Sequence, residues 1–101
     1  MAAININQFN YQNEVMESEK KVLLDFWAPW CGPCRMVVPI VEEIAEERPD
    51  IKVGKINVDE EPELARQFGI VSIPTLVVMD HGRLTEQARG ARPKKAILEM
   101  L

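Results

Sequence analysis

The sequence predicts an α/β protein with a central, mostly parallel sheet and helices on both of its faces. Short apolar segments alternate with helical segments along the chain, an order typical of parallel sheets covered by helices. The segment at residues 22–27 is almost continuously apolar, as in a strand that is buried on both sides. A turn at His81-Gly82 joins two extended segments and adds an antiparallel hairpin. We expect the order β-α-β-α-β-α-β-β-α in a single domain of residues 1–101.

The first half of the chain contains two strands and two helices. Residues 3–6 predict a weak strand, and Asn7 can cap the next helix, because its side-chain oxygen can accept hydrogen bonds from free N–H groups. Residues 22–27 form the second strand, and a long helix follows over residues 31–48. The apolar stripe of that helix runs through Cys34, Val37, Val38, Val41, Ile44 and Ala45.

The second half continues the alternation. Residues 51–58 predict a strand whose alternation of apolar and polar residues is broken at Gly54. Asp59 can cap a short helix over residues 62–68, with Pro62 in the first turn, where a missing N–H costs little. The remaining elements are two strands at residues 75–80 and 84–89 and a terminal helix at residues 93–101.

Composition excludes several classes of function. The 101 residues include 12 basic and 16 acidic side chains, a net charge of −4, with no basic tract or basic helix to bind nucleic acid or an anionic membrane. No apolar run approaches the roughly 20 residues that span a bilayer. The first ten residues lack a basic region followed by an apolar one, so we expect no secretory signal. We also expect the protein to be cytoplasmic and monomeric.

The two cysteines, Cys31 and Cys34, lie at the expected start of the long helix. A disulfide between them closes a very small loop and adds about 2 kcal/mol, against about 4.7 kcal/mol for a 100-residue loop. Such a pair suits a bond that is made and broken. Cys34 lies on the apolar stripe and should face the core, whereas Cys31 should lie at the helix tip. Free N–H groups and the helix dipole stabilise an anion there, so we expect a lowered pKa for Cys31.

The chain around these cysteines resembles the thioredoxin family. The segment that carries the resemblance reads Phe26-Trp27-Ala28-Pro29-Trp30-Cys31-Gly32-Pro33-Cys34-Arg35-Met36. It continues at Asp25, Ile73-Pro74-Thr75 and Gly90-Ala91, and it covers nearly the whole chain. The resemblance implies the thioredoxin fold, a central mixed sheet flanked by helices on both faces, and the activity of a protein disulfide reductase.

The resemblance also implies a role for each cysteine. Cys31 matches the nucleophile that attacks a substrate disulfide, and Cys34 matches the resolving cysteine that releases the reduced substrate from the mixed disulfide. No cofactor is implied beyond the redox-active Cys31–Cys34 pair. The implied partners are disulfide-containing client proteins and a thioredoxin reductase, either a flavin enzyme that uses NADPH or a ferredoxin-linked one.

Asp25 is expected to assist the second cysteine. A carboxylate within an apolar strand is desolvated, which raises its pKa, and such a group can take a proton from the Cys34 thiol. The alternative is an edge-strand aspartate that faces solvent. Lys55 matches a family position near this carboxylate, where a cation would partly offset the shift; the alternative is an exposed strand lysine with no role.

The resemblance implies a flat, weakly polar docking surface for substrate. Ile73-Pro74 matches the family's cis-proline, and the backbone of Ile73 can pair with an extended substrate segment. The expected docking residues are Trp30, Gly32, Pro33, Ile73, Pro74, Gly90 and Ala91. Trp27 is expected to pack in the core instead.

One departure from the family is a basic residue, Arg89, directly before Gly90. With Arg92, Lys94 and Lys95 it forms a local basic patch, which is either a solvated helix start or a surface that favours acidic partners. We treat Arg89 as a possible modulator of partner choice.

Three other functions are alternatives to the reductase. Zinc usually needs four ligands, and two cysteines and one distant histidine do not supply them, so no metal site is expected. An oxidant or isomerase of the same fold is the second alternative; Gly32-Pro33 resembles the reducing relatives, whereas oxidising ones tend to carry a histidine there. The third is a binding module whose role would survive replacement of both cysteines by serine.

Overall fold

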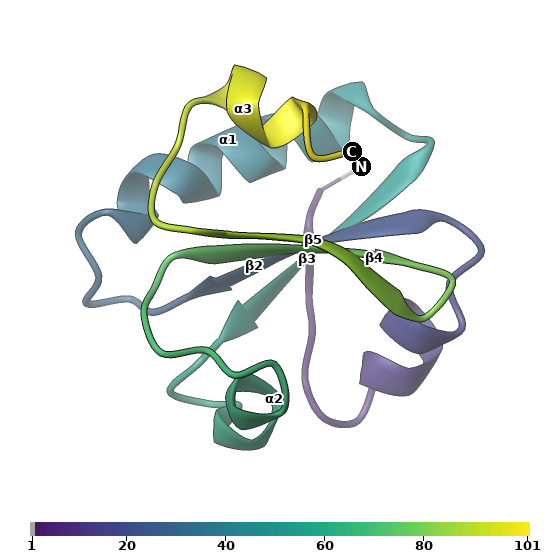
Figure 1. Cartoon of the computed structure of the whole chain (residues 1–101), viewed down its shortest axis with the longest axis horizontal. Helices are drawn as coiled ribbons and strands as arrows, with labels where there is room; N and C mark the ends of the chain where they lie inside the picture. The colour runs from purple at the N-terminus through teal and green to yellow at the C-terminus, as the bar shows by residue number, and fades with distance from the viewer. Residues whose placement is uncertain (1) are drawn as a thin grey trace.

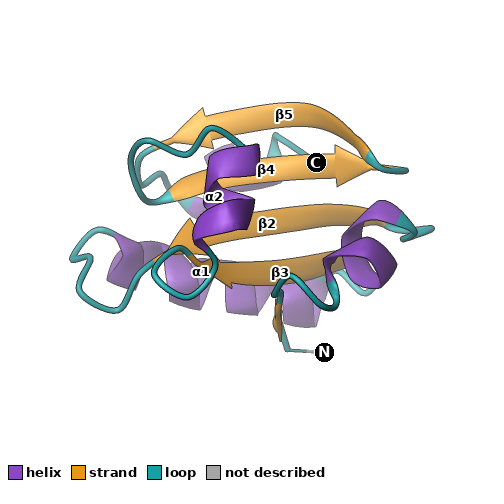
Figure 2. Ribbon diagram, turned by 90° about the horizontal axis from the view of Figure 1, so that it is seen from below, coloured by secondary structure: helices purple, strands orange, loops and turns teal. Residues whose placement is uncertain are grey.

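The computed structural model describes residues 2–101 and contains a five-stranded mixed sheet with the order β1-β3-β2-β4-β5. The strands are β1 (Ile4–Asn5), β2 (Lys21–Trp27), β3 (Ile51–Asn57), β4 (Thr75–Asp80) and β5 (Arg83–Arg89). Strand β3 lies parallel to both β1 and β2, whereas β4 is antiparallel to β2 and to β5. Figure 2 shows four of these strands side by side, with β5 at one edge. The expected hairpin between β4 and β5 is confirmed.

Helices cover both faces of this sheet, as expected. The helices α1 (Cys34–Glu47) and α3 (Lys94–Leu98) lie on one face, and α2 (Pro62–Gln67) lies on the other together with η1 (Gln12–Met16), which is a π-helix (Figure 1). Asn7 does cap the turn before η1, because its Oδ1 accepts the N–H groups of Phe9 and Asn10.

The central strand β2 separates two hydrophobic cores. Val22, Leu24 and Phe26 point to the α2 face, whereas Leu23 packs against α1 and α3. All four are fully buried, which explains the continuous apolar run in the sequence. Asp25 alternates with Leu24 and therefore lies on the same face as Leu23, beneath α1.

Three local expectations are wrong. The terminal helix is shorter than expected, because α3 ends at Leu98 and not at Leu101. The long helix begins at Cys34, three residues later than expected, because Gly32 and Pro33 form a turn that precedes it. Asp59 does not cap α2: the residue before that helix is Glu61, which makes no side-chain cap, and the Asp59 carboxylate accepts a hydrogen bond from Trp30 instead. The Asp59 carboxylate thus binds a residue that is distant in sequence instead of the nearby N–H groups at the start of α2.

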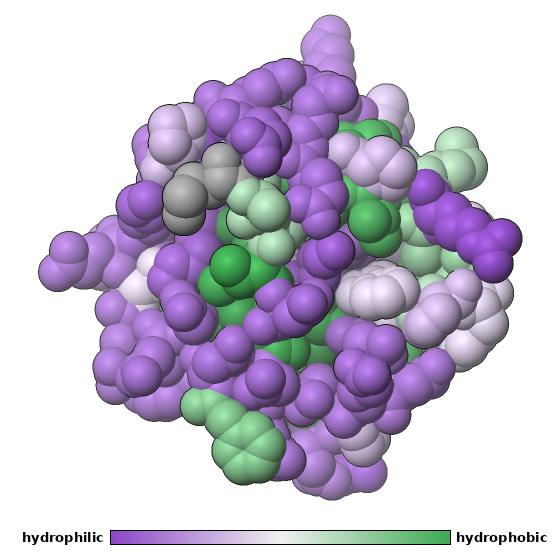
Figure 3. Space-filling view, turned by 180° about the vertical axis from the view of Figure 1, so that it is seen from behind, coloured by the Kyte–Doolittle hydropathy of each residue, from purple (hydrophilic) through white to green (hydrophobic). Residues whose placement is uncertain are grey.

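The surface viewed in Figure 3 is largely hydrophilic, with hydrophobic residues showing mainly in a recess near its centre. Within residues 2–101, no helix has the length and apolar character that crossing a membrane requires.

Candidate active site

The loop between β2 and α1 carries the disulfide that joins Cys31 and Cys34, whose Cα atoms are 5.3 Å apart. The backbone N–H of Cys34, the first residue of α1, donates a hydrogen bond to Cys31 Sγ over 3.2 Å. Cys31 therefore lies where the unpaired N–H groups of the helix gather, as expected. These N–H groups and the helix dipole favour a negative charge on that sulfur once the disulfide is reduced.

The expected contrast in burial between the two cysteines is wrong for this oxidised form. Cys31 is 4% exposed and Cys34 is 1% exposed. Both pack in a small apolar cluster with Ala28, and Trp27, Val58 and Ile73 lie against it. The disulfide holds Cys31 against Cys34 and inside this cluster, so the two residues differ in their hydrogen bonding more than in their exposure.

The segment before β4 brings a distant part of the chain to Cys31. The Ile73–Pro74 peptide bond is cis, as the family resemblance implied. Cys31 Sγ lies 3.8 Å from the carbonyl oxygen of Ile73, and the N–H of Gly90 donates to the carbonyl of Pro74 over 2.8 Å. Ile73, Pro74 and Gly90 therefore meet beside the disulfide although they are far from it in sequence.

The expected docking residues differ in their exposure to solvent. Ile73 and Gly90 are half-buried, and Pro74 is buried. The exposed ones are Trp30, Gly32, Pro33 and Ala91. Trp30 is 68% exposed, and its indole Nε1–H donates to Asp59 Oδ2 over 2.8 Å, which fixes the ring beside the disulfide. Trp27 is half-buried and lies against the cysteine cluster, in agreement with a packing role.

A pocket next to the disulfide extends this surface toward α2. It has a volume of about 330 Å³ and is lined by Trp30, Val58, Ala65, Ile70, Val71, Ser72 and Ile73. Five of these residues are not among those expected from the sequence. Val71 is 79% exposed. A β-branched apolar residue between Gly69 and the Ile73–Pro74 peptide bond is the one sequence signal that could have indicated the pocket residues. The pocket is mainly apolar and open to one side.

Asp25 is fully buried, as expected, and desolvation raises the pKa of its carboxyl group from 3.8 to about 7. Neither of its carboxylate oxygens has a hydrogen-bond partner among residues 2–101. The charge of Lys55 acts in the opposite direction and lowers this pKa. A carboxyl group with these properties can gain or lose a proton near neutral pH.

Lys55 lies directly opposite Asp25 in the register of β2 and β3. Its Nζ donates a hydrogen bond to Glu42 Oε2 over 2.9 Å and lies 6.0 Å from the centre of the Trp27 ring. The alternative of an exposed strand lysine is therefore wrong, because the side chain is 17% exposed.

Arg89 ends β5 and pairs in register with Thr75, directly after Pro74. The basic patch around it is smaller than the sequence indicates, because Lys94 forms ion pairs with Glu43 and Glu47 of α1. Arg92 donates to the backbone carbonyl of Arg89. Lys94 links α3 to α1 and its charge is locally compensated.

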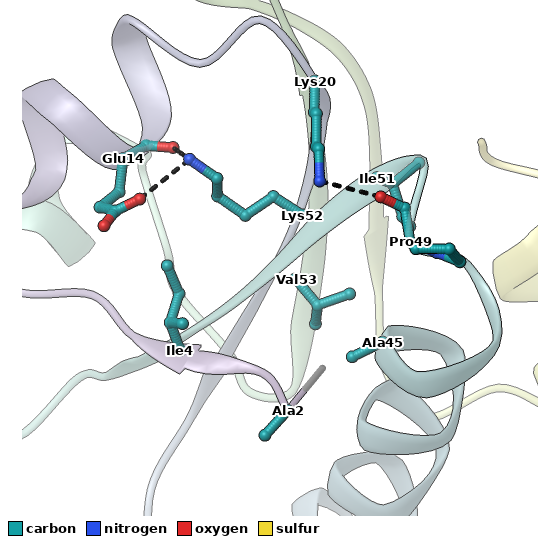
Figure 4. A pocket seen from close by; sticks show the side chains of 9 residues that line it. All are labelled: Ala2, Ile4, Glu14, Lys20, Ala45, Pro49, Ile51, Lys52 and Val53. Atoms are coloured by element: carbon teal, nitrogen blue, oxygen red, sulfur yellow. Dashed lines mark hydrogen bonds and ion pairs between the residues drawn. The ribbon is translucent and has the colours of Figure 1, made fainter.

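Another pocket, of about 200 Å³, lies at the opposite end of the sheet, where α1 ends and β3 begins (Figure 4). Its polar side chains already have partners: Lys52 Nζ donates to the backbone carbonyl and the carboxylate of Glu14, and Lys20 Nζ donates to the carbonyl of Pro49. This pocket is separate from the disulfide. Within residues 2–101, no group of three or more His, Cys, Asp or Glu side chains is arranged to hold a metal ion.

Known proteins share this architecture. Residues 2–101 match the family model described as Thioredoxin. Thioredoxin 1 of Nostoc sp. is 48% identical over 101 residues, which cover 99% of this chain and 94% of that protein. Thioredoxin of Mycobacterium tuberculosis is also 48% identical, with 99% of this chain and 87% of that protein covered.

One solved structure is described as the structural basis of the thiol resolving mechanism in yeast mitochondrial 1-Cys peroxiredoxin via glutathione/thioredoxin systems. A chain in it superposes with a TM-score of 0.86 at 28% identity, covering 96% of this chain and 91% of that one. The mixed sheet and the disulfide at the start of α1 define a thiol–disulfide oxidoreductase. The chain belongs to the thioredoxin family and has the thioredoxin fold.

Proposed function

We propose that the protein reduces disulfides of client proteins, with Cys31 as the nucleophile and Cys34 as the resolving cysteine. The observation that carries the assignment is the hydrogen bond from the Cys34 N–H to Cys31 Sγ. In the reduced protein this bond stabilises a thiolate at Cys31, and the thiolate is the form that attacks disulfides.

In the first step, the Cys31 thiolate attacks one sulfur of a client disulfide. A Cys31–client disulfide forms, the client S–S bond breaks, and the second client sulfur leaves as a thiolate that takes a proton from water. The Ile73 carbonyl lies beside the attacking sulfur, and the residue is only half-buried, so we propose that this carbonyl accepts a hydrogen bond from an extended client segment.

In the second step, Cys34 attacks Cys31 Sγ, the Cys31–Cys34 disulfide forms, and the remaining client sulfur leaves. Cys34 is buried and must first lose its proton. We assign Asp25 as the base, because it lies beneath α1 and its pKa of about 7 suits proton transfer at neutral pH. The two electrons that reduce the client come from the dithiol, which becomes a disulfide.

The docking surface of the proposal comprises Trp30, Gly32, Pro33, Ile73, Pro74, Gly90 and Ala91, and we extend it to the pocket lined by Val71. Its apolar character suits an exposed, extended segment on either side of a client cysteine. Arg89 lies at its rim and is assigned a role in choosing acidic clients.

The cycle is completed when a thioredoxin reductase, of the NADPH–flavin or the ferredoxin-linked kind, returns two electrons to the Cys31–Cys34 disulfide. We propose that no further cofactor is bound. We also propose that residues 1–101 act as one domain, as a monomer, in the reducing environment of the cytoplasm, where a C-x-x-C pair can turn over.

Reduction of insulin disulfides with a dithiol donor tests the proposed function. The protein should accelerate the reaction, and Cys31→Ser should remove the acceleration. Alkylation of Cys31 in the reduced protein, followed against pH, should report a pKa below the usual value of about 8.5 for a thiol. Ordinary thiol behaviour, or a Cys31→Ser protein that is as active as the original, would refute the assignment.

A further inference from the structure

Asp25 and Lys55 face each other across β2 and β3 but form no hydrogen bond. They are register partners on parallel strands, so their side chains lie on the same face of the sheet, beneath α1. Both carboxylate oxygens of Asp25 lack a hydrogen-bond partner among residues 2–101, whereas Lys55 Nζ donates to Glu42 Oε2 over 2.9 Å. The cation that acts on Asp25 is therefore bound to a different carboxylate.

Glu42 is held at both of its oxygens. Oε2 accepts from Lys55, and Oε1 accepts from the backbone N–H of Ala3 over 2.9 Å, which ties the segment before β1 to α1. The hydrogen bond from Lys55 lowers the pKa of Glu42, so the carboxylate is charged at neutral pH. The side chains of Lys55 and Glu42 are 17% and 35% exposed, and water screens this pair less than a fully exposed one.

We propose that Glu42 is a positioning residue for the second step: it holds the Lys55 ammonium away from Asp25, so that Asp25 can accept the proton of Cys34. The inference rests on the role proposed above for Asp25. Lys55 on β3 is the charged group that acts on Asp25. The helix α1, which covers this face, carries Cys34 and Glu42, and the partner of Asp25 on β4 is the apolar Leu76.

Loss of Glu42 should lower the pKa of the buried Asp25 carboxyl group. A released Lys55 ammonium is free to pair with Asp25, which is otherwise without a partner. A directly paired cation lowers the pKa of a carboxyl group by about one to three pH units. Asp25 would then be a weaker base and the resolving step would slow.

The first test is a titration of the Asp25 carboxyl group in the reduced protein, followed by NMR of ¹³C-labelled aspartate. In Glu42→Gln, the pKa of Asp25 should fall from about 7 by about one to three pH units. Glu43→Gln is the matched control: it removes the same charge from the next residue of α1, whose partner is Lys94. The control should leave the titration of Asp25 unchanged.

Glu42→Gln also removes a negative charge, which by itself favours an ionised Asp25. Lys55→Met separates the two effects, because it removes the cation but keeps the length of the side chain. In the Lys55→Met background only the direct effect of the lost negative charge remains, so Glu42→Gln should lower the pKa of Asp25 by clearly less than it does when Lys55 is present. A shift of the same size with and without Lys55, or no shift in the single variant, would overturn the positioning role.

The rate of mixed-disulfide resolution against pH provides the functional readout. In Glu42→Gln, the midpoint of this profile should move down together with the carboxyl titration. A shifted titration with an unshifted rate profile would refute Asp25 as the base, and with it the functional part of the inference. An unshifted titration would refute only the placement of Lys55 by Glu42.

Discussion

The backbone N–H of Cys34 points at Cys31 Sγ from 3.2 Å, so the residue proposed to resolve the mixed disulfide also supplies the hydrogen bond to the proposed nucleophile. The bond exists because Cys34 is the first residue of α1 and its N–H has no partner within the helix. A substitution of the Cys34 side chain leaves this N–H in place. The two proposed roles can therefore be separated by mutation.

Cys34→Ser should trap the mixed disulfide between Cys31 and a client, because the first step is intact and the second has no nucleophile. Cys31→Ser should form no such adduct at the same client concentration. Non-reducing electrophoresis of both variants after incubation with insulin measures the adduct. More adduct with Cys31→Ser than with Cys34→Ser would reverse the proposed assignment.

Asp25→Asn should stabilise the folded protein at pH 8. The pKa of Asp25 is raised from 3.8 to about 7 on folding, so the folded state binds the proton more tightly, and stability is lost progressively as the pH rises from about 4 to about 7. The shift corresponds to about 4 kcal/mol in the free energy of unfolding at pH 8. Urea denaturation should show most of this gain at pH 8 and little of it near pH 4.

The exposed Glu60 provides the control for that measurement. Glu60→Gln also removes one carboxyl group, but not one that folding buries, so the gain in the free energy of unfolding at pH 8 should be absent. If Asp25→Asn shows the same stability difference at pH 4 and pH 8, burial does not raise the pKa of Asp25.

Gly54→Ala should destabilise the fold by about 1–3 kcal/mol. A Cβ at this position in β3 would lie 2.7 Å from Ile6 Cγ1 and 3.1 Å from Leu24 Cδ2, and both of these side chains are buried. Gly32→Ala is the control, because nothing lies within 4 Å of its added methyl group. Equal midpoints of urea unfolding for the two variants would show that the space beside Gly54 can expand.

Arg89→Ala should slow the reduction of an acidic client at low salt by up to about fivefold, the effect of losing one exposed charge interaction. Added salt should reduce the difference, because it screens exposed charges. Arg83→Ala, at the other end of β5, removes the same charge far from Pro74 and should leave the rate unchanged. Identical rates for Arg89→Ala and the unaltered protein at every salt concentration would exclude the role in partner choice.

The secondary structure was largely predictable, because the patterns that specify it are local. The apolar run of β2, the stripe of α1 and the turn at His81-Gly82 each identify an element without reference to the rest of the chain. Two of the errors lie at the starts of helices, α1 and α2. Asp59 binds the indole of Trp30 instead of capping α2, and the turn at Gly32 and Pro33 delays the start of α1.

The sequence by itself determined the alternation of strands and helices, the C-x-x-C pair at a helix start and the burial of Asp25, since periodicity and short spacings carry that information. Only the tertiary structure decided that Ile73 meets Cys31 across 42 residues, that Val71 lines a pocket beside the disulfide, and that Lys55 pairs with Glu42 instead of Asp25. The physical reason is that such contacts depend on strand register and on how helices pack over the sheet. Both are set by the whole core at once.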